Sequence, residues 1–264
     1  MDRRRVQGPE TSVVPFPLLD DAAPGVVAPP LQAGKRAGGR RPEDMRPIFL
    51  RTGLISQASG SAYIEMGRTK VACAVYGPRQ IKKQQGFSEQ GRLYCEFKFA
   101  TFACKKRRNH QRDSQEKEFS QVIVQALTPS IRLEKLPKSV VDIYVTVVEN
   151  DGTASCLAAA ITAASTALAD AGVEMIDLVA AASLAYQQRR PEGDAPTGEN
   201  TREAGAADLV LAQMPSLGDV THLLHRGPVD WAQMSRAVEQ CIDVCAKIHA
   251  VMVHSLREHS AAEQ

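Results

Sequence analysis

The stretch RPIFLRTGLISQASGSAYIEMGRTKVACAVYGPR, residues 46–79, decides the fold of this chain because it is typical of two β-strands joined by a tight turn. Residues 54–66 and 71–76 have the small, β-branched and apolar composition of strands. Between them, residues 67–70 carry a glycine, which permits the positive φ of a hairpin turn. The Gly-Pro pair at residues 77–78 is expected to end the second strand.

Outward from this hairpin, the hydrophobic pattern alternates between strands and helices. Further strands are expected at residues 91–100, 141–147, 176–186, 207–214 and 219–225. Helices are expected at residues 116–127, 153–171 and 229–257. The second is almost entirely small or apolar and should be buried, with Gly172 as its C-terminal stop. The third is predicted to turn one face inward, formed by Trp231, Met234, Val238, Ile242, Cys245 and Ile248. This order of elements predicts a single α+β domain with a mixed sheet and packed helices.

The chain divides by composition into three regions. Residues 1–40 are rich in Pro, Gly and Arg and predict a disordered N-terminal tail. Residues 41–258 form the expected domain, and residues 259–264 a short C-terminal tail.

Basic residues gather in local clusters although the formal net charge is only +2. This distribution predicts contact with a polyanion on one face. No apolar run approaches the ~18 residues of a membrane helix, and no apolar stretch follows the basic start, so a soluble intracellular protein is expected. The six cysteines form no CxxC pair and are interpreted as small buried hydrophobes in a reducing compartment.

Three segments resemble RNase PH domains: residues 46–79, residues 118–149, and residues 151–172, which enter and complete the small-residue helix. The similar order and spacing extend over roughly residues 40 to 255. The resemblance implies the RNase PH fold, whose β-α-β-α core is similar to the second domain of ribosomal protein S5. The family contains active phosphorolytic exoribonucleases and inactive subunits of the RNA exosome ring.

Active members hold inorganic phosphate at the start of the buried helix, where free amides attract an anion and an arginine clamps it. The corresponding residues here are Gly152, Thr153 and Ser155, with Ala154 in place of the arginine. Loss of that clamp should cost about 2–3 kcal/mol of anion binding. The favoured interpretation is a degenerate phosphate site at which Asp151 or Thr153 only caps the helix.

Active members also carry a rigid carboxylate pair after the strand that follows this helix. Here that position is a Gly- and Pro-rich stretch whose acids do not match the pattern: Glu192, Asp194, Glu199 and Glu203. Catalytic acids need rigid placement, so these are interpreted as solvated loop charges. No catalytic residue, metal ligand or cofactor is expected.

A basic loop follows the strand at residues 91–100 and, by the resemblance, lies near the central pore and contacts RNA. Its predicted RNA-binding residues are Lys105, Lys106, Arg107, Arg108 and Arg112, and His110 lies in the same cluster. Weaker candidates are Arg79, Lys82 and Lys83. No aromatic residue alternates with the charges, so binding should be indifferent to sequence and sensitive to salt.

The resemblance therefore implies a non-catalytic exosome ring subunit that contributes to assembly and to the path of single-stranded RNA. It further implies a six-membered ring of RNase PH-like subunits, a heterodimer with the Rrp-forty-two type, a cap of RNA-binding subunits, and residence in nucleus, nucleolus and cytoplasm.

Three alternatives stay open. An active phosphate-dependent 3'-to-5' exoribonuclease would need an unrecognised site. A doubly wound small-molecule enzyme would need a Gly-rich phosphate loop, which is absent. A free-standing RNA-binding module would be a stable monomer.

Overall fold

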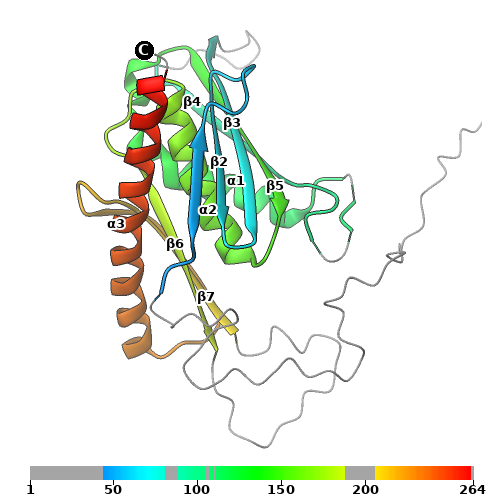
Figure 1. The fold of residues 1–264 in the computed structure, drawn as a ribbon, viewed down its shortest axis with the longest axis vertical. Coiled ribbons are helices and arrows are strands. Elements are labelled where there is room, and N and C mark those ends of the chain that lie inside the picture. The colour runs from blue at the N-terminus through cyan, green and yellow to red at the C-terminus, as the bar shows by residue number, and fades with distance from the viewer. Residues whose placement is uncertain (1–43, 81–88, 105–106, 110, 188–205, 263–264) are drawn as a thin grey trace, which may run out of the picture. The chain divides into compact units, whose positions relative to one another are not determined.

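A mixed five-stranded sheet in the order β1-β2-β3-β5-β4 is built from the first half of the chain (Figure 1). The β4–β5 pair is parallel and the other pairs are antiparallel. Its strands are β1 Ile48–Thr52, β2 Gly60–Met66, β3 Thr69–Gln80, β4 Arg92–Phe99 and β5 Ser139–Glu149. This computed structural model describes residues 44–80, 89–104, 107–109, 111–187 and 206–262. The predicted N-terminal tail, residues 1–40, lies outside the described residues.

The predicted hairpin is formed by β2 and β3, and Gly67 in its turn has φ 64°, as expected. Two boundaries differ from the prediction. β2 begins only at Gly60, and a separate strand, β1, precedes it. β3 also continues past Gly77 and Pro78 to Gln80, because a shift in register between Tyr76 and Arg79 accommodates the proline, which has no N–H to donate.

Helix α2 (Thr153–Asp170) lies between this sheet and a second, three-stranded sheet, and residues 155–168 are all buried. Close packing requires small residues: a Cβ on Gly60 would lie 2.2 Å from the backbone nitrogen of Ala171. Gly172, with φ 71°, follows the helix as predicted. Alone among the described helices, α2 has the length and composition of a membrane span, but its burial within the domain identifies it as a core helix.

The second sheet has the order β6-β7-β8, all antiparallel, and is formed by β6 Ala180–Gln187, β7 Ala206–Met214 and β8 Asp219–Arg226. Helix α3 (Trp231–Ala262) packs on β6 and β7, on the side away from α2 (Figure 1). It continues through the predicted C-terminal tail, residues 259–264, as far as Ala262.

The predicted inner face of α3 is wrong in its first half. Trp231 is 81% exposed, and Met234, Val238 and Ile242 are only partly buried. The buried side chains are Ala237, Cys241, Cys245, Ile248, Met252 and Ser255. In the first half of α3 the buried positions are thus Ala237 and Cys241, each one residue before the predicted Val238 and Ile242.

Helix α1 (Ser114–Leu127) protects an edge of the first sheet, and two short 3-10 turns, η2 Thr128–Ser130 and η3 Leu133–Lys135, lead from it to β5. On β4, the amide of Phe97 donates to Ser120 Oγ at 3.1 Å and the amide of Phe99 donates to Glu116 Oε1 at 3.0 Å. Side chains thus bond strand amides that would otherwise be open for pairing. The prediction of one α+β domain with a mixed sheet and packed helices is confirmed.

Candidate functional site

The start of α2, where the degenerate phosphate site is predicted, is capped by Gly152 without any side-chain hydrogen bond. The prediction that Asp151 or Thr153 caps this helix is therefore wrong. Asp151 is drawn away by Arg46, whose guanidinium lies 3.1 Å from its carboxylate and donates to Ser155 Oγ at 3.3 Å. Arg46 stands more than a hundred residues earlier in the chain, so no local pattern reveals this contact.

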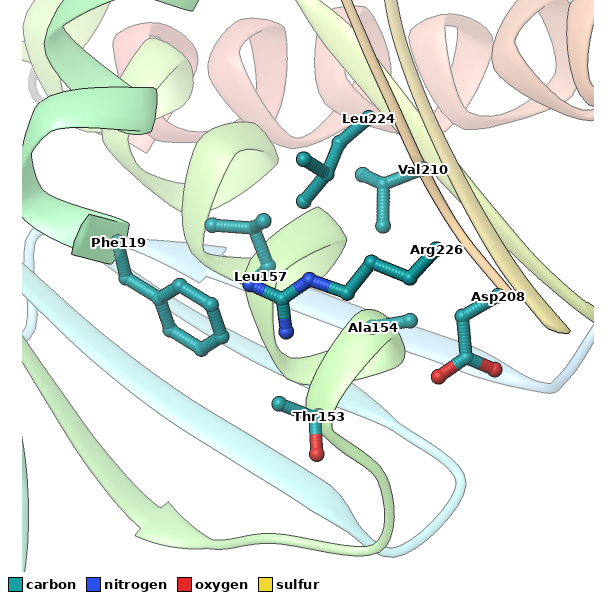
Figure 2. A pocket seen from close by; sticks show the side chains of 8 residues that line it. All are labelled: Phe119, Thr153, Ala154, Leu157, Asp208, Val210, Leu224 and Arg226. Carbon is teal, nitrogen blue, oxygen red and sulfur yellow. The ribbon is translucent and has the colours of Figure 1, made fainter. Parts of the chain in front are cut away.

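A small hollow opens beside the same helix end, and Figure 2 shows the side chains that line it. From α2 come Thr153, Ala154 and Leu157. From the facing elements come Phe119, Asp208, Val210, Leu224 and Arg226. The structure thus brings together two of the predicted site positions, Thr153 and Ala154, with two charged residues that the sequence reasoning missed, Asp208 and Arg226.

Asp208 and Arg226 are direct cross-strand partners in the β7–β8 hairpin. Arg226 extends across the hollow toward α1, where its guanidinium pairs with Glu118 and lies 5.8 Å from the centroid of the Phe119 ring (Figure 2). A carboxylate therefore already neutralises the arginine of the hollow, and Asp208 adds a further negative charge. This arrangement disfavours an inorganic anion.

Asp208 and Arg226 could have been found from sequence only if the strand register had been known. Asp208 lies within the predicted strand 207–214 and Arg226 directly after the strand predicted at 219–225. A hairpin between these strands implies that they approach each other. Which residues face each other depends on the turn and on a register shift after Ala212.

Two groups named from the sequence lie outside the described residues: the acids interpreted as solvated loop charges, Glu192, Asp194, Glu199 and Glu203, and the basic candidates Lys82, Lys83, Lys105, Lys106 and His110. Within the described part of the chain, no group of three or more His, Cys, Asp or Glu side chains could hold a metal ion.

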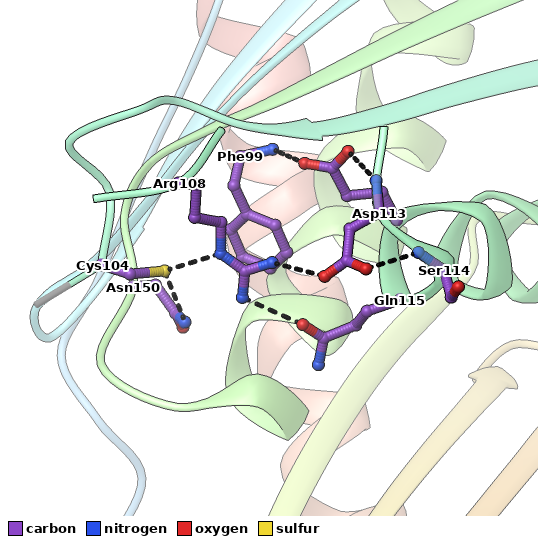
Figure 3. A network of polar contacts seen from close by, with 8 residues as sticks. Phe99, Cys104, Arg108, Asp113, Ser114, Gln115 and Asn150 are labelled. Atoms are coloured by element: carbon purple, nitrogen blue, oxygen red, sulfur yellow. Dashed lines mark hydrogen bonds and ion pairs between the residues drawn. The ribbon is translucent and has the colours of Figure 1, made fainter. Parts of the chain in front are cut away.

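In the basic loop, Arg108 is bound into the fold (Figure 3). Its guanidinium carbon lies 4.0 Å from the centroid of the Phe99 ring, its Nη2 donates to Gln115 Oε1 at 2.9 Å, and its Nη1 lies 3.6 Å from Asp113. Its Nε also donates to Cys104 Sγ at 3.3 Å. Asp113 in turn caps α1 through a capping box with Glu116. Arg108 thus anchors the loop to the start of α1.

The other described basic residues that are predicted to contact RNA differ in how exposed and how strongly bonded their side chains are. Arg107 is exposed. Arg112 donates to Ser120 Oγ at 2.8 Å. Arg79, on the first sheet, is paired with Asp142 and also bonded to Tyr144, contacts that raise its pKa. Of these side chains, Arg107 is the one best placed to meet a phosphate backbone.

The cysteines largely match their interpretation as buried hydrophobes. All six are free, and Cys73, Cys156, Cys241 and Cys245 are buried. Burial raises the pKa of the Cys241 thiol to about 11 and that of Cys245 to about 12. Cys95, although only partly shielded, also has a pKa raised by burial, to about 12, whereas Cys104 lies in the basic loop.

The amino-acid sequence of this chain is similar to those of several known proteins. Residues 44–174 match the family described as RNase PH, "3' exoribonuclease family, domain 1". The chain is 35% identical to exosome complex component mtr3 of Schizosaccharomyces pombe, over 97% of this chain and 95% of that protein. It is 37% identical to exosome complex component MTR3 of Homo sapiens, over 100% of this chain and 98% of that protein.

Two further similarities extend the comparison. Exosome complex component Rrp41 of Pyrococcus furiosus is 36% identical over 85% of this chain and 89% of that protein. The crystal structure of rice (Oryza sativa) Rrp46 superposes with a TM-score of 0.68 at 25% identity, covering 84% of this chain and 100% of that chain. All three sequence segments that carry the resemblance lie within the residues that the family matches.

Proposed function

The chain belongs to the RNase PH family of 3' exoribonucleases, and from this we propose that it is a non-catalytic subunit of the RNA exosome ring, of the Mtr-three type. Relatives named as exosome components cover nearly its whole length, and the domain has the family's fold. Its role is then to complete a ring of RNase PH-like subunits and to contribute to the path of the RNA that the ring processes.

The observation that carries the absence of catalysis is the electrostatics of the hollow beside α2. Phosphorolysis needs a bound phosphate as nucleophile, and the helix start offers Ala154 where the resemblance implies a clamping arginine. The arginine nearest in the hollow, Arg226, is paired with Glu118. Asp208 lines the same hollow and repels an anion. The site therefore lacks a free cation to hold phosphate among the described residues.

RNA contact is proposed to be made by the basic loop around Arg107, through phosphates and without reading bases. Arg108 serves this contact indirectly, because it fixes the loop to Phe99 and α1. The finer partners, a heterodimer with the Rrp-forty-two type and a cap of RNA-binding subunits, are proposals that rest on the family resemblance. Residence in nucleus, nucleolus and cytoplasm is proposed on the same ground.

The test is to purify the chain with its candidate partner and to measure phosphate-dependent release of nucleoside diphosphates from single-stranded RNA. We expect co-elution, no phosphorolysis, and RNA crosslinking to the basic loop that weakens as salt rises. The contrary outcome is that the complex still performs phosphorolysis when the partner's own site is inactivated, and that Asp208→Asn abolishes this activity. That result would contradict the proposal and establish the alternative of an active exoribonuclease. If the chain is a stable monomer that does not bind the candidate partner, the result would instead favour a free-standing RNA-binding module.

A further inference from the structure

No described helix packs on one face of the first sheet. Helices α1 and α2 pack on its inner face, which carries the apolar side chains of β2 to β5. The strand register places a different set of residues on the outer face, because directly opposed residues point to the same side of a sheet. We call this set the outer face: Phe49, Arg51, Ser61, Tyr63, Glu65, Lys70, Ala72, Ala74, Tyr76, Arg79, Arg92, Tyr94, Glu96, Lys98, Val140, Asp142, Tyr144 and Thr146.

Tyrosine is concentrated on this face. The chain has five tyrosines, and Tyr63, Tyr76, Tyr94 and Tyr144 all lie here. Tyr94 is 45% exposed, Tyr144 is 40% exposed, and Phe49 at the β1 edge is 52% exposed. In a chain with only 5% aromatic residues, an exposed group of this size on one open sheet is not accounted for by core packing.

Three of the tyrosines, Tyr76, Tyr94 and Tyr144, cluster around an ion pair. Tyr76 on β3 and Tyr94 on β4 are both cross-strand partners of Asp142 on β5. Tyr76 packs edge-on against Tyr144, with ring centroids 5.6 Å apart, and Asp142 pairs with Arg79. Rigid tyrosine rings beside an arginine are the composition of the energetically dominant centre of protein–protein interfaces, because they bury large areas at low entropic cost.

The charges of the face favour a protein over RNA as its occupant. Two of its three acids are bonded to neighbours, Asp142 to Arg79 and Glu65 to the hydroxyl of Tyr63 at 2.7 Å, and Lys70 pairs with Glu149 at 3.0 Å. Three acids interleave with five basic side chains, and two of the basic side chains, Lys70 and Arg79, are paired with carboxylates. The face therefore has only a small positive excess and a weak field toward a polyanion. With strands about 4.8 Å apart and about 3.3 Å of rise per residue, it offers on the order of 500 Å² of flat area before side-chain relief is counted. This is comparable to the about 800 Å² that one partner buries in a standard interface.

We propose that the outer face is a docking surface for a neighbouring RNase PH-like subunit, with Tyr94 and Tyr144 as its anchors. This inference rests on the proposed function, since it names the surface through which the chain joins its ring. The partner surface is expected to be mixed apolar and polar, to pack mainly against the tyrosine rings, and to have no strong net charge.

The experiment is reconstitution of the ring with the double variant Tyr94→Ser/Tyr144→Ser, followed by native mass spectrometry over a range of concentrations. We expect the concentration needed for incorporation to rise by about tenfold or more, which is the effect of losing interface anchors. The double variant Tyr94→Phe/Tyr144→Phe keeps the rings and should incorporate nearly as the wild type. Trp231→Ser, which removes an even more exposed aromatic residue outside the face, should leave incorporation unchanged.

A second measurement avoids any effect of substitution on folding. Hydroxyl-radical footprinting of the wild-type chain, free and in the ring, should show protection of Tyr94 and Tyr144 on assembly. If the wild type assembles while both tyrosines stay reactive and the serine variant incorporates normally, the docking face is wrong and the proposed function stands. Protection of the tyrosines by RNA alone, or in the free chain by its own N-terminal residues, would also overturn the inference. If the wild type does not join exosome subunits at all, the proposed function itself fails.

Discussion

Asp208 on β7 and Arg226 on β8 are direct cross-strand partners, and both line the hollow at the N-terminal end of α2. Arg226 nevertheless pairs with Glu118 of α1, and its side chain points across the hollow toward Phe119 (Figure 2). The positive charge that lines the hollow is therefore neutralised from within the domain. An anion entering the hollow would have to displace Glu118 and tolerate Asp208.

We expect inorganic phosphate at millimolar concentration to leave the Tm of the wild-type chain unchanged. The double variant Glu118→Gln/Asp208→Asn frees Arg226 and removes the repelling carboxylate, so phosphate should stabilise it. At ten times Kd the gain is about 1.4 kcal/mol in the free energy of unfolding. Differential scanning fluorimetry with chloride and phosphate buffers measures this. Glu239→Gln, an exposed carboxylate on α3, is the matched control. Stabilisation of the wild type by phosphate would contradict the degenerate site.

Glu116→Ala should destabilise the domain strongly. This side chain is 4% exposed and accepts from the amides of Phe99 and Asp113, so its loss leaves two donors without their acceptor and opens the β4 edge. We expect a loss of about 2–4 kcal/mol in the free energy of unfolding, measured by urea titration. The neighbouring Glu118→Ala removes only an exposed ion pair and should cost about 0–1 kcal/mol. Equal effects of the two variants would refute this role of Glu116.

Much of the fold could be predicted from local pattern. The hairpin follows from Gly67 between two strand-like runs, and the buried helix from its small residues and Gly172. The inner face of α3 could not be predicted in its first half, because the buried side chains there include small Ala237 and Cys241, one residue before the larger apolar Val238 and Ile242. The continuation of β3 past Pro78 depends on pairing with β5, some sixty residues away.

The candidate site was less accessible to sequence reasoning, for a physical reason. Ala154 could be singled out because it lies in a contiguous motif. Asp208 and Arg226 could not, because their approach depends on hairpin register, and the displacement of Asp151 depends on distant Arg46. Arg108 was predicted to bind RNA with its cationic neighbours, and nothing in the residue order indicates that Phe99 and Gln115 engage it.

Substitutions of Arg108 and Arg107 should therefore have different effects: the first should lower stability, and the second should weaken RNA contact. Arg108→Ala loses a ring contact and two side-chain hydrogen bonds, and we expect it to lower the free energy of unfolding by about 1–3 kcal/mol. Arg107→Ala should leave stability within about 0.5 kcal/mol of wild type and weaken RNA crosslinking at low salt. Urea unfolding and crosslinking of the assembled complex measure the two effects. The opposite assignment, with Arg107 structural and Arg108 dispensable for folding, would show that the loop is held differently.

Substitutions along α3 should follow the buried face observed in the structure. Trp231→Ser changes a largely exposed side chain and should alter the free energy of unfolding of the chain by less than about 0.5 kcal/mol. Ile248→Ala creates a cavity beneath the helix and should cost about 2–5 kcal/mol. Urea titration distinguishes the two. A large loss of stability for Trp231→Ser would restore the face predicted from sequence.

The buried thiols should make the domain less stable in alkali. Burial raises the pKa of Cys241 to about 11 and that of Cys245 to about 12, whereas a thiol in the unfolded chain ionises near pH ~8.5. Above that pH the unfolded chain releases protons that the folded chain retains, so the free energy of unfolding falls as pH rises toward 11. Each thiol contributes a slope of up to about 1.4 kcal/mol per pH unit in this range. Urea titrations between pH 7.5 and 10.5 should give a shallower decline for Cys241→Ala/Cys245→Ala than for the wild type, by up to about 2.7 kcal/mol per pH unit. If the two proteins decline in parallel, Cys241 and Cys245 ionise in the folded domain near the pH at which they ionise in the unfolded chain. Their burial under α3 would then not raise their pKa values.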